Sequence, residues 1–138
     1  MKRIIALMLS LIFCVALAYC GVTEAPADIW ETALHTSDSE FGSGEKTIQL
    51  EVNAEEKSVT FTVHTDKEIL GDALMEHQLI AGEKGAYGIY IKSVNGMVAD
   101  YDKTQTYWEL CKDGESLSTG ADGVEIADGD KYEFIYKK

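Results

Sequence analysis

Arginine is nearly absent from this sequence of 138 residues. The single arginine is Arg3, and lysine and arginine together number 12, against 24 aspartate and glutamate residues. Phosphate neutralisation by these two cations supplies most of the non-specific affinity of proteins for nucleic acid. Bidentate clamps on phosphate or carboxylate ligands also need the guanidinium group. The net charge of −12 therefore argues against nucleic acid as a partner and is typical of an acidic, soluble surface.

Cysteine and histidine are scarce, with three of each. The sequence contains no C-x-x-C pair and no paired histidine spacing, and its acidic stretch ADGVEIADGDKY lacks the ligand order of an EF-hand, so we expect no metal site. Cys111 lies within an apolar strand pattern and is most simply a small buried residue. If the signal peptide is cleaved after Ala18, Cys20 keeps its thiol, and a disulfide between Cys20 and Cys111 is an alternative.

The residue patterns of common catalytic sites are also missing. His35, His64 and His77 have no aspartate or serine at a recognisable nucleophile or base spacing. No G-x-G-x-x-G or Walker pattern occurs, and nothing brings Glu109 and Asp130 together as a glycosidase pair. We therefore expect no enzyme activity, no catalytic residues and no cofactor.

Only one long apolar run is present, at residues 4–18. It is shorter than the roughly 20 residues that a membrane span needs, and it follows the basic start Met1-Lys2-Arg3. This pattern predicts a secretory signal peptide over residues 1–20.

Two processing routes fit the end of this signal. Ala16-Leu17-Ala18 is an A-x-A cleavage site, whereas the segment ending in Cys20-Gly21 resembles the lipoprotein box, in which the cysteine is lipidated. Tyr19 departs from that box, which prefers a small residue there. Either route places the mature chain outside the cytoplasm, secreted or at the cell surface, and the only membrane contact expected is a lipid anchor on Cys20.

Residues 21–46 contain the only proline, Pro26, together with serines, glycines and scattered acids. No apolar period is sustained there, although Trp30 and Leu34 could form one helical turn. The composition predicts a flexible tether over residues 21–46.

The remaining residues, 47–138, show the periodicities of one α+β domain. Apolar residues alternate over 48–52 and 59–63, which predicts a β-hairpin. Thr65-Asp66-Lys67-Glu68 fits a capping box for a helix of about twelve residues, in which Gly71 marks a close packing contact and Gly82 ends the helical region.

Further strands are expected over residues 87–92, 106–112 and 131–136, with a tight turn at Asn95-Gly96 and a short strand at 124–127. The order of elements predicts a β-grasp-like fold, in which one helix packs across a mixed sheet.

Aromatic and glycine residues cluster on the second half of this domain. Most strand aromatics fill the core, but alternation cannot direct both Tyr107 and Trp108 inward, so one of them should lie at the rim. A rim aromatic is a candidate contact for a flat or apolar ligand. The candidate ligand-binding residues are Tyr87, Gly88, Tyr107, Trp108, Ser118, Thr119 and Gly120.

The segments GIYIKSVNG and TYWELCKDGESLSTGADGVEIADGDKYEFIY resemble the C-terminal β-domain of transcobalamin and intrinsic factor, and the related small domain of secreted bacterial proteins. The shared pattern comprises the N-G turn, Y-W at a strand start, a glycine-containing turn, Gly120 and D-G-D before the last strand. The resemblance covers residues 47–138.

The resemblance implies a non-enzymatic module that covers one face of cobalamin or a related corrinoid, with the strand start at Tyr107 and the loop 118–120 facing the ring. The helical barrel that completes the site in the vitamin carriers is not in this sequence, so the resemblance implies half a site, which a partner protein would complete. The alternative is a surface interaction module that binds a protein or a cell-wall glycan by stacking or strand addition.

Overall fold

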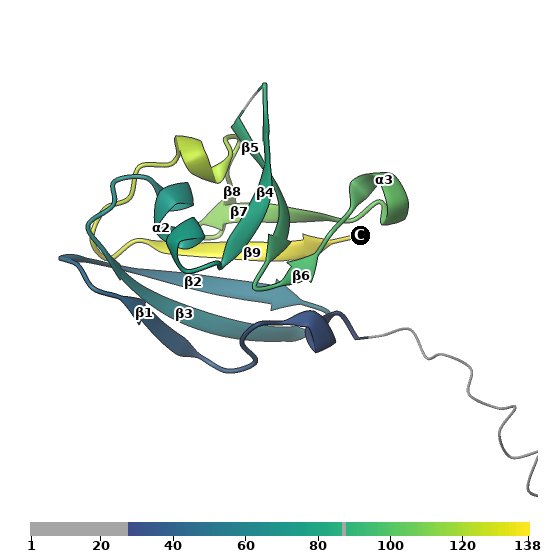
Figure 1. Cartoon of the computed structure of the whole chain (residues 1–138), viewed down its shortest axis with the longest axis horizontal. Coiled ribbons are helices and arrows are strands. Elements are labelled where there is room, and N and C mark those ends of the chain that lie inside the picture. The colour runs from purple at the N-terminus through teal and green to yellow at the C-terminus, as the bar shows by residue number, and fades with distance from the viewer. Residues whose placement is uncertain (1–27, 87) are drawn as a thin grey trace, which may run out of the picture.

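The computed structural model describes residues 28–86 and 88–138 (Figure 1). The expected signal peptide and the expected lipidation site, Cys20, lie outside these residues and stay predictions. Within the described ranges, no helix has the length and apolarity needed to cross a membrane.

The larger of two sheets has six strands in the order β1-β3-β2-β9-β7-β8. It is mixed, because β1 runs parallel to β3 and β2 runs parallel to β9, while the other pairs are antiparallel. Its strands are β1 (Ser39–Gly42), β2 (Lys46–Ala54), β3 (Lys57–Thr65), β7 (Tyr107–Lys112), β8 (Glu115–Ser116) and β9 (Lys131–Lys137).

The smaller sheet has the order β4-β5-β6 and runs across one face of the larger sheet (Figure 1). It comprises β4 (Ile80–Gly85), β5 (Gly88–Val94) and β6 (Met97–Val98). The helices are short: the 3-10 turns η2 (Ile29–Thr32) and η3 (Ala121–Gly123), and the α-helices α2 (Leu70–Glu76) and α3 (Tyr101–Thr104). Phe61 and Phe134 of the larger sheet and Leu70 and Leu74 of α2 are fully buried in one continuous core.

The predicted hairpin is confirmed, because β2 and β3 pair antiparallel over their full length and bury alternate side chains. The strands predicted in the second half, and the tight turn at Asn95-Gly96, are also present. Residues 124–127 differ from the prediction: they form no strand, and Glu125 makes only an isolated bridge to Ile69.

The two-sheet arrangement supports the α+β class with a mixed sheet and does not confirm a β-grasp. Strands β4, β5 and β6 form a sheet of their own instead of extending the first one. The β4 strand also occupies residues that were assigned to the end of the helix, so Gly82 lies in a strand. A side chain at position 82 would meet the Tyr90 carbonyl at 2.0 Å, and this close approach explains the glycine.

The helix α2 is shorter than predicted, and the capping box does not form. The residue before the helix is Ile69, which makes no side-chain capping bond. The Thr65 hydroxyl instead accepts a hydrogen bond from the Lys67 N–H at 3.0 Å, a local turn that competes with helix formation. Gly71 does mark close packing, but against η3, since a Cβ there would lie 3.1 Å from the Asp122 nitrogen.

Residues 28–42 are folded onto the domain, which corrects the prediction of a tether over 21–46 for the part that the structure describes. We call residues 28–42 the N-terminal strap. The Trp30 indole N–H donates to the Ala54 carbonyl at 2.9 Å, and Trp30 is 7% exposed. Further along the strap, β1 pairs with β3, and Phe41 packs edge-on against Phe61. Each of these contacts depends on a single apolar side chain. The strap therefore has no apolar period from which the sequence could predict them.

Candidate ligand-binding pocket

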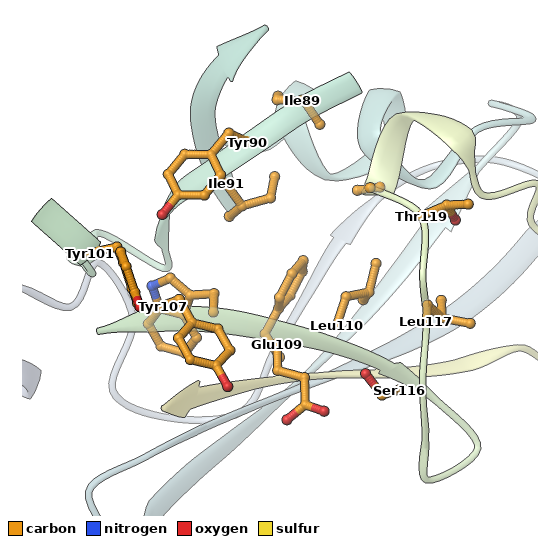
Figure 2. A pocket seen from close by; sticks show the side chains of 14 residues that line it. Ile89, Tyr90, Ile91, Tyr101, Tyr107, Glu109, Leu110, Ser116, Leu117 and Thr119 are labelled. Atoms are coloured by element: carbon orange, nitrogen blue, oxygen red, sulfur yellow. The ribbon is translucent and has the colours of Figure 1, made fainter. Parts of the chain in front are cut away.

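A pocket of about 470 Å³ lies between β5 of the smaller sheet and β7 of the larger sheet (Figure 2). Ile91 and Leu110 lie in its middle, tyrosines lie at one end, and the loop of Leu117 and Thr119 lies at the other. The lining residues are Ile89, Tyr90, Ile91, Tyr101, Tyr107, Trp108, Glu109, Leu110, Ser116, Leu117, Thr119, Gly120, Ala121 and Phe134.

The adjacent aromatics Tyr107 and Trp108 point to opposite faces of β7. Trp108 is 7% exposed, its indole N–H donates to the Met97 carbonyl at 3.1 Å, and its ring lies edge-on against Tyr136. Tyr107 is 42% exposed. The prediction that only one of the two rings is buried is therefore confirmed, with Trp108 inward and Tyr107 outward.

Three exposed tyrosines gather at one end of the pocket. Tyr90 comes from β5, Tyr101 from α3 and Tyr107 from β7, and each is at least 42% exposed. Figure 2 shows Tyr90 and Tyr101 on the same side of the pocket, with Tyr107 below them. Exposed rings from three separate elements are unusual on a small soluble domain and are typical of a contact surface.

The edge of β7 is open where it borders the pocket. β8 pairs only with Cys111 and Lys112, and the Leu117 N–H donates to the Leu110 carbonyl at 2.9 Å. Alternate residues of a strand direct their main-chain groups to the same side, so the main chain of Trp108 faces the pocket side. No strand in the described part of the chain pairs with it there, which leaves a donor and an acceptor for a ligand.

One carboxyl side chain, Glu109, belongs to the lining. A hydrogen bond from Ser116 and the ammonium of Lys137, 3.3 Å away, hold the pKa of the Glu109 carboxyl below its usual value. The side chain is directed away from β5 (Figure 2). Glu109 is thus an ionised carboxylate at the edge of a pocket whose other described lining residues are uncharged at neutral pH.

The loop after β8 closes the far end of the pocket. Gly120 lies so close to β5 that a Cβ would be 3.1 Å from the Ile89 carbonyl. Ala121, at the start of η3, is fully buried. This close approach explains the glycine that the sequence places after Thr119 and fixes the loop against the smaller sheet.

Four of the predicted ligand-binding residues come together in this lining: Tyr107, Trp108, Thr119 and Gly120. Ser118 is exposed and Gly88 lies at the start of β5, and neither belongs to the lining. Tyr87 lies outside the described residues. The sequence did not indicate Tyr101, Glu109, Leu110 or Leu117, because only the crossing of the two sheets brings them to one place.

No group of three or more metal-ligating side chains occurs among residues 28–86 and 88–138. Cys111 is buried and has no disulfide partner among residues 28–86 and 88–138. Burial, followed by the charges of Glu109 and Glu133, raises the pKa of its thiol. A protonated, enclosed thiol is a poor nucleophile.

Comparison with known proteins places the chain in a family. The model of a domain of unknown function, DUF4430, matches residues 68–138, which is just over half of the chain. The chain belongs to the DUF4430 family. A search of the curated proteins found no match.

Solved structures that resemble this DUF4430 chain include two of particular interest. The first is a suspected metal-binding protein from Ruminococcus gnavus, with 36% identity and a TM-score of 0.65 over 68% of this chain and 98% of that one. The second is haptocorrin in complex with Cbi, with 23% identity and a TM-score of 0.57 over 71% of this chain. This chain spans 26% of the haptocorrin chain, and the likeness shows a shared fold.

Proposed function

We propose that this DUF4430 chain is a non-enzymatic, extracytoplasmic binding module whose pocket between β5 and β7 covers one face of a flat small molecule such as a corrinoid. The observation that carries the proposal is the split at Tyr107 and Trp108. One ring is anchored in the core, and the other is exposed beside an apolar pocket.

The chemistry of the pocket supports a flat ligand with an apolar face. Ile91 and Leu117, which are partly buried, supply aliphatic surface, and Tyr107 supplies an exposed aromatic ring. This is the type of lining that holds most small-molecule ligands. The open main chain of Trp108 offers hydrogen bonds at the edge, which would orient polar substituents of the ligand. Haptocorrin, which shares the fold, was crystallised with Cbi, and this supports a corrinoid as the first ligand to test.

The pocket is shallow enough that a partner could complete it. Tyr101 and Tyr107 are 56% and 42% exposed, so a ligand lying on them would keep its other face open. We infer that a second protein covers that face, as the resemblance to the vitamin carriers implies. Affinity of the isolated module is then expected to be weak.

The two tryptophans provide a matched test. Trp30 and Trp108 are each 7% exposed and each donates an indole hydrogen bond to a main-chain carbonyl, but only Trp108 lines the pocket. Titration with cobalamin should shift the absorbance of the vitamin and quench tryptophan fluorescence in the wild type and in Trp30→Phe. The quenching should be lost in Trp108→Phe.

Two results would contradict the proposal. The absence of both the spectral shift and the quenching at high micromolar cobalamin would exclude the corrinoid as a ligand. Quenching that survives in Trp108→Phe but disappears in Trp30→Phe would place binding outside this pocket.

A second candidate function is a surface interaction module that binds a protein or wall glycan. The exposed rings of Tyr90, Tyr101 and Tyr107 favour it, because sugar rings stack on exposed aromatic side chains. Co-sedimentation with purified cell wall tests the glycan. Binding should fall in Tyr101→Ala and persist in Met75→Ala, which alters an exposed apolar residue on α2.

Export and attachment form part of the proposal. Metabolic labelling with palmitate should modify the wild-type chain, and Cys20→Ala should remove the label if Cys20 carries the lipid. A secreted, unlabelled wild-type chain would instead favour cleavage after Ala18.

A further inference from the structure

From the charges around the pocket we infer that it accepts an uncharged or cationic ligand face and rejects anions. This inference rests on the proposed function and narrows the chemical class of the ligand. It concerns the part of the ligand that enters between β5 and β7, so that any phosphate or carboxylate of the ligand must stay outside.

Among the residues that the structure describes, no basic side chain lines the pocket. Its fourteen residues include no lysine, arginine or histidine, and the described residues contain no arginine at all. An anion that enters loses its hydration, and this loss is costly unless a cation or several hydrogen-bond donors replace the water. The lining offers no cation for this purpose.

One donor of the lining is already used. The indole N–H of Trp108 donates to the Met97 carbonyl at 3.1 Å in a buried position. The remaining donors are the hydroxyl groups of Tyr90, Tyr101, Thr119 and other lining residues, and the main chain of Trp108. Neutral donors of this kind also bind carbonyl and hydroxyl oxygens, so their presence does not by itself select an anion over an uncharged polar group.

The carboxylate of Glu109, which does line the pocket, disfavours an anionic ligand. Glu109 is ionised, because Ser116 and Lys137 lower the pKa of its carboxyl. Lys137 lies 3.3 Å from Glu109 but does not line the pocket, so it offsets the carboxylate without offering a cation to the ligand. The net charge of −12 adds repulsion at long range.

Aromatic rings favour the same class of ligand. The faces of Tyr90, Tyr101 and Tyr107 carry partial negative charge, which attracts a cation placed over them and repels an anion. For a corrinoid, the ring and its neutral amide groups would enter the pocket. We therefore expect a corrinoid without the phosphate-containing nucleotide to bind at least as well as cobalamin.

A matched pair of fluorescent probes tests the inference directly. N-phenyl-1-naphthylamine and 1-anilinonaphthalene-8-sulfonate share one ring system and differ by the sulfonate. We expect the wild-type chain to bind the neutral probe and to bind the sulfonate at least about tenfold more weakly, which corresponds to about 1.4 kcal/mol. The affinities are measured by fluorescence titration at low and at physiological ionic strength.

Two neighbouring positions give a gain-of-function test with its control. Thr119 and Ser118 are both exposed, but only Thr119 lines the pocket. Thr119→Lys should bring the affinity for the sulfonate to within about threefold of that for the neutral probe, because it supplies the missing cation. Ser118→Lys makes the same change in net charge and should leave the discrimination in place.

The outcomes separate the inference from the function on which it rests. If the wild type binds neither probe, the proposed pocket function fails. If it binds both probes equally, or if Ser118→Lys acts as strongly as Thr119→Lys, the function stands and the charge inference is overturned. Retained discrimination in Thr119→Lys would overturn it as well.

Discussion

Asn95 binds the main chain of His35 through both the oxygen and the nitrogen of its side-chain amide. Its Oδ1 accepts from the His35 N–H at 3.0 Å, and its Nδ2 donates to the His35 carbonyl at 2.7 Å. Asn95 is fully buried, and its carbonyl accepts from the Leu34 N–H at 2.8 Å. The N-terminal strap is thereby joined to the turn between β5 and β6, in the sheet that forms one side of the pocket.

Replacing Asn95 by alanine should lower the free energy of unfolding by about 2–3 kcal/mol, because two partly buried main-chain groups of His35 lose their partners. Urea denaturation measures this loss. Asn95→Gly is the control for the backbone, since φ at this position is +53° and glycine adopts that conformation freely. If Asn95→Gly is as stable as the wild type, the side-chain bonds do not hold the strap.

Trp30 should contribute strongly to stability although it lies in a segment that looks like a linker. Trp30→Ala is expected to cost about 3–5 kcal/mol, the usual range for removing a buried aromatic side chain. Leu34→Ala, in the same strap but at a side chain that is 54% exposed, should change stability by no more than about 0.5 kcal/mol.

Truncation tests where the folded domain begins along the chain. A chain that begins at Thr47 should unfold at a lower temperature than one that begins at Asp28. Equal melting temperatures for the two chains would show that the strap is dispensable and that the domain begins at residue 47.

Neighbouring positions on β7 should separate stability from binding. Trp108→Ala should destabilise the domain by about 3–5 kcal/mol, because the indole is buried and bonded to Met97. Tyr107→Ala should cost about 0.5 kcal/mol or less and act mainly on ligand affinity, because the ring is exposed. Thermal unfolding of both variants checks this, and similar losses in the two would mean that Tyr107 is a core residue.

Glu133 should make the domain less stable at neutral pH. Burial first, and then the carboxylates of Glu51 and Glu109, raise the pKa of Glu133 in the folded state. The folded chain therefore holds this proton more tightly than the unfolded chain, so the stability it contributes falls as the pH rises through the carboxylate range.

Glu133→Gln should consequently stabilise the domain at pH 7, by about 0.5–1 kcal/mol, and the gain should disappear in acid, where the wild-type carboxyl is already protonated. The substitution keeps the oxygen that accepts from Asn53. Glu56→Gln, at the exposed β2–β3 turn, is the control for net charge. A gain that is independent of pH would point to packing as its cause.

Local patterns predicted the strands and tight turns well. The alternation around Leu50 and Phe61 is strong because one face of each strand is fully buried. The positive φ at Asn95 and Gly96 fits the Asn-Gly pair, because asparagine tolerates this conformation and glycine, without a Cβ, adopts it freely. The helix was predicted too long because Thr65 and Glu68 fit a capping box, whereas the Glu68 carbonyl accepts from Ile126 in the structure.

Long-range relationships could not be read in the same way. The division into two sheets depends on how β4 and β5 pair with each other instead of with β7. The pocket follows from that division, so Tyr101 and Leu117 could not be assigned to it from the sequence. Strand alternation predicts that one of Tyr107 and Trp108 lies at the rim. Which of the two does so depends on which face of β7 packs against the core, and the local sequence pattern does not determine this.

The N-terminal strap also determines how mechanical tension would enter the molecule. A pull on the chain before Asp28 reaches Trp30 first, then Asn95, and only then β1. Since β1 lies parallel to β3, pulling along it loads several hydrogen bonds together in shear instead of opening them one at a time. A module attached to a surface by its amino end would thus release its outer anchors in sequence before the strands that form the pocket are disturbed.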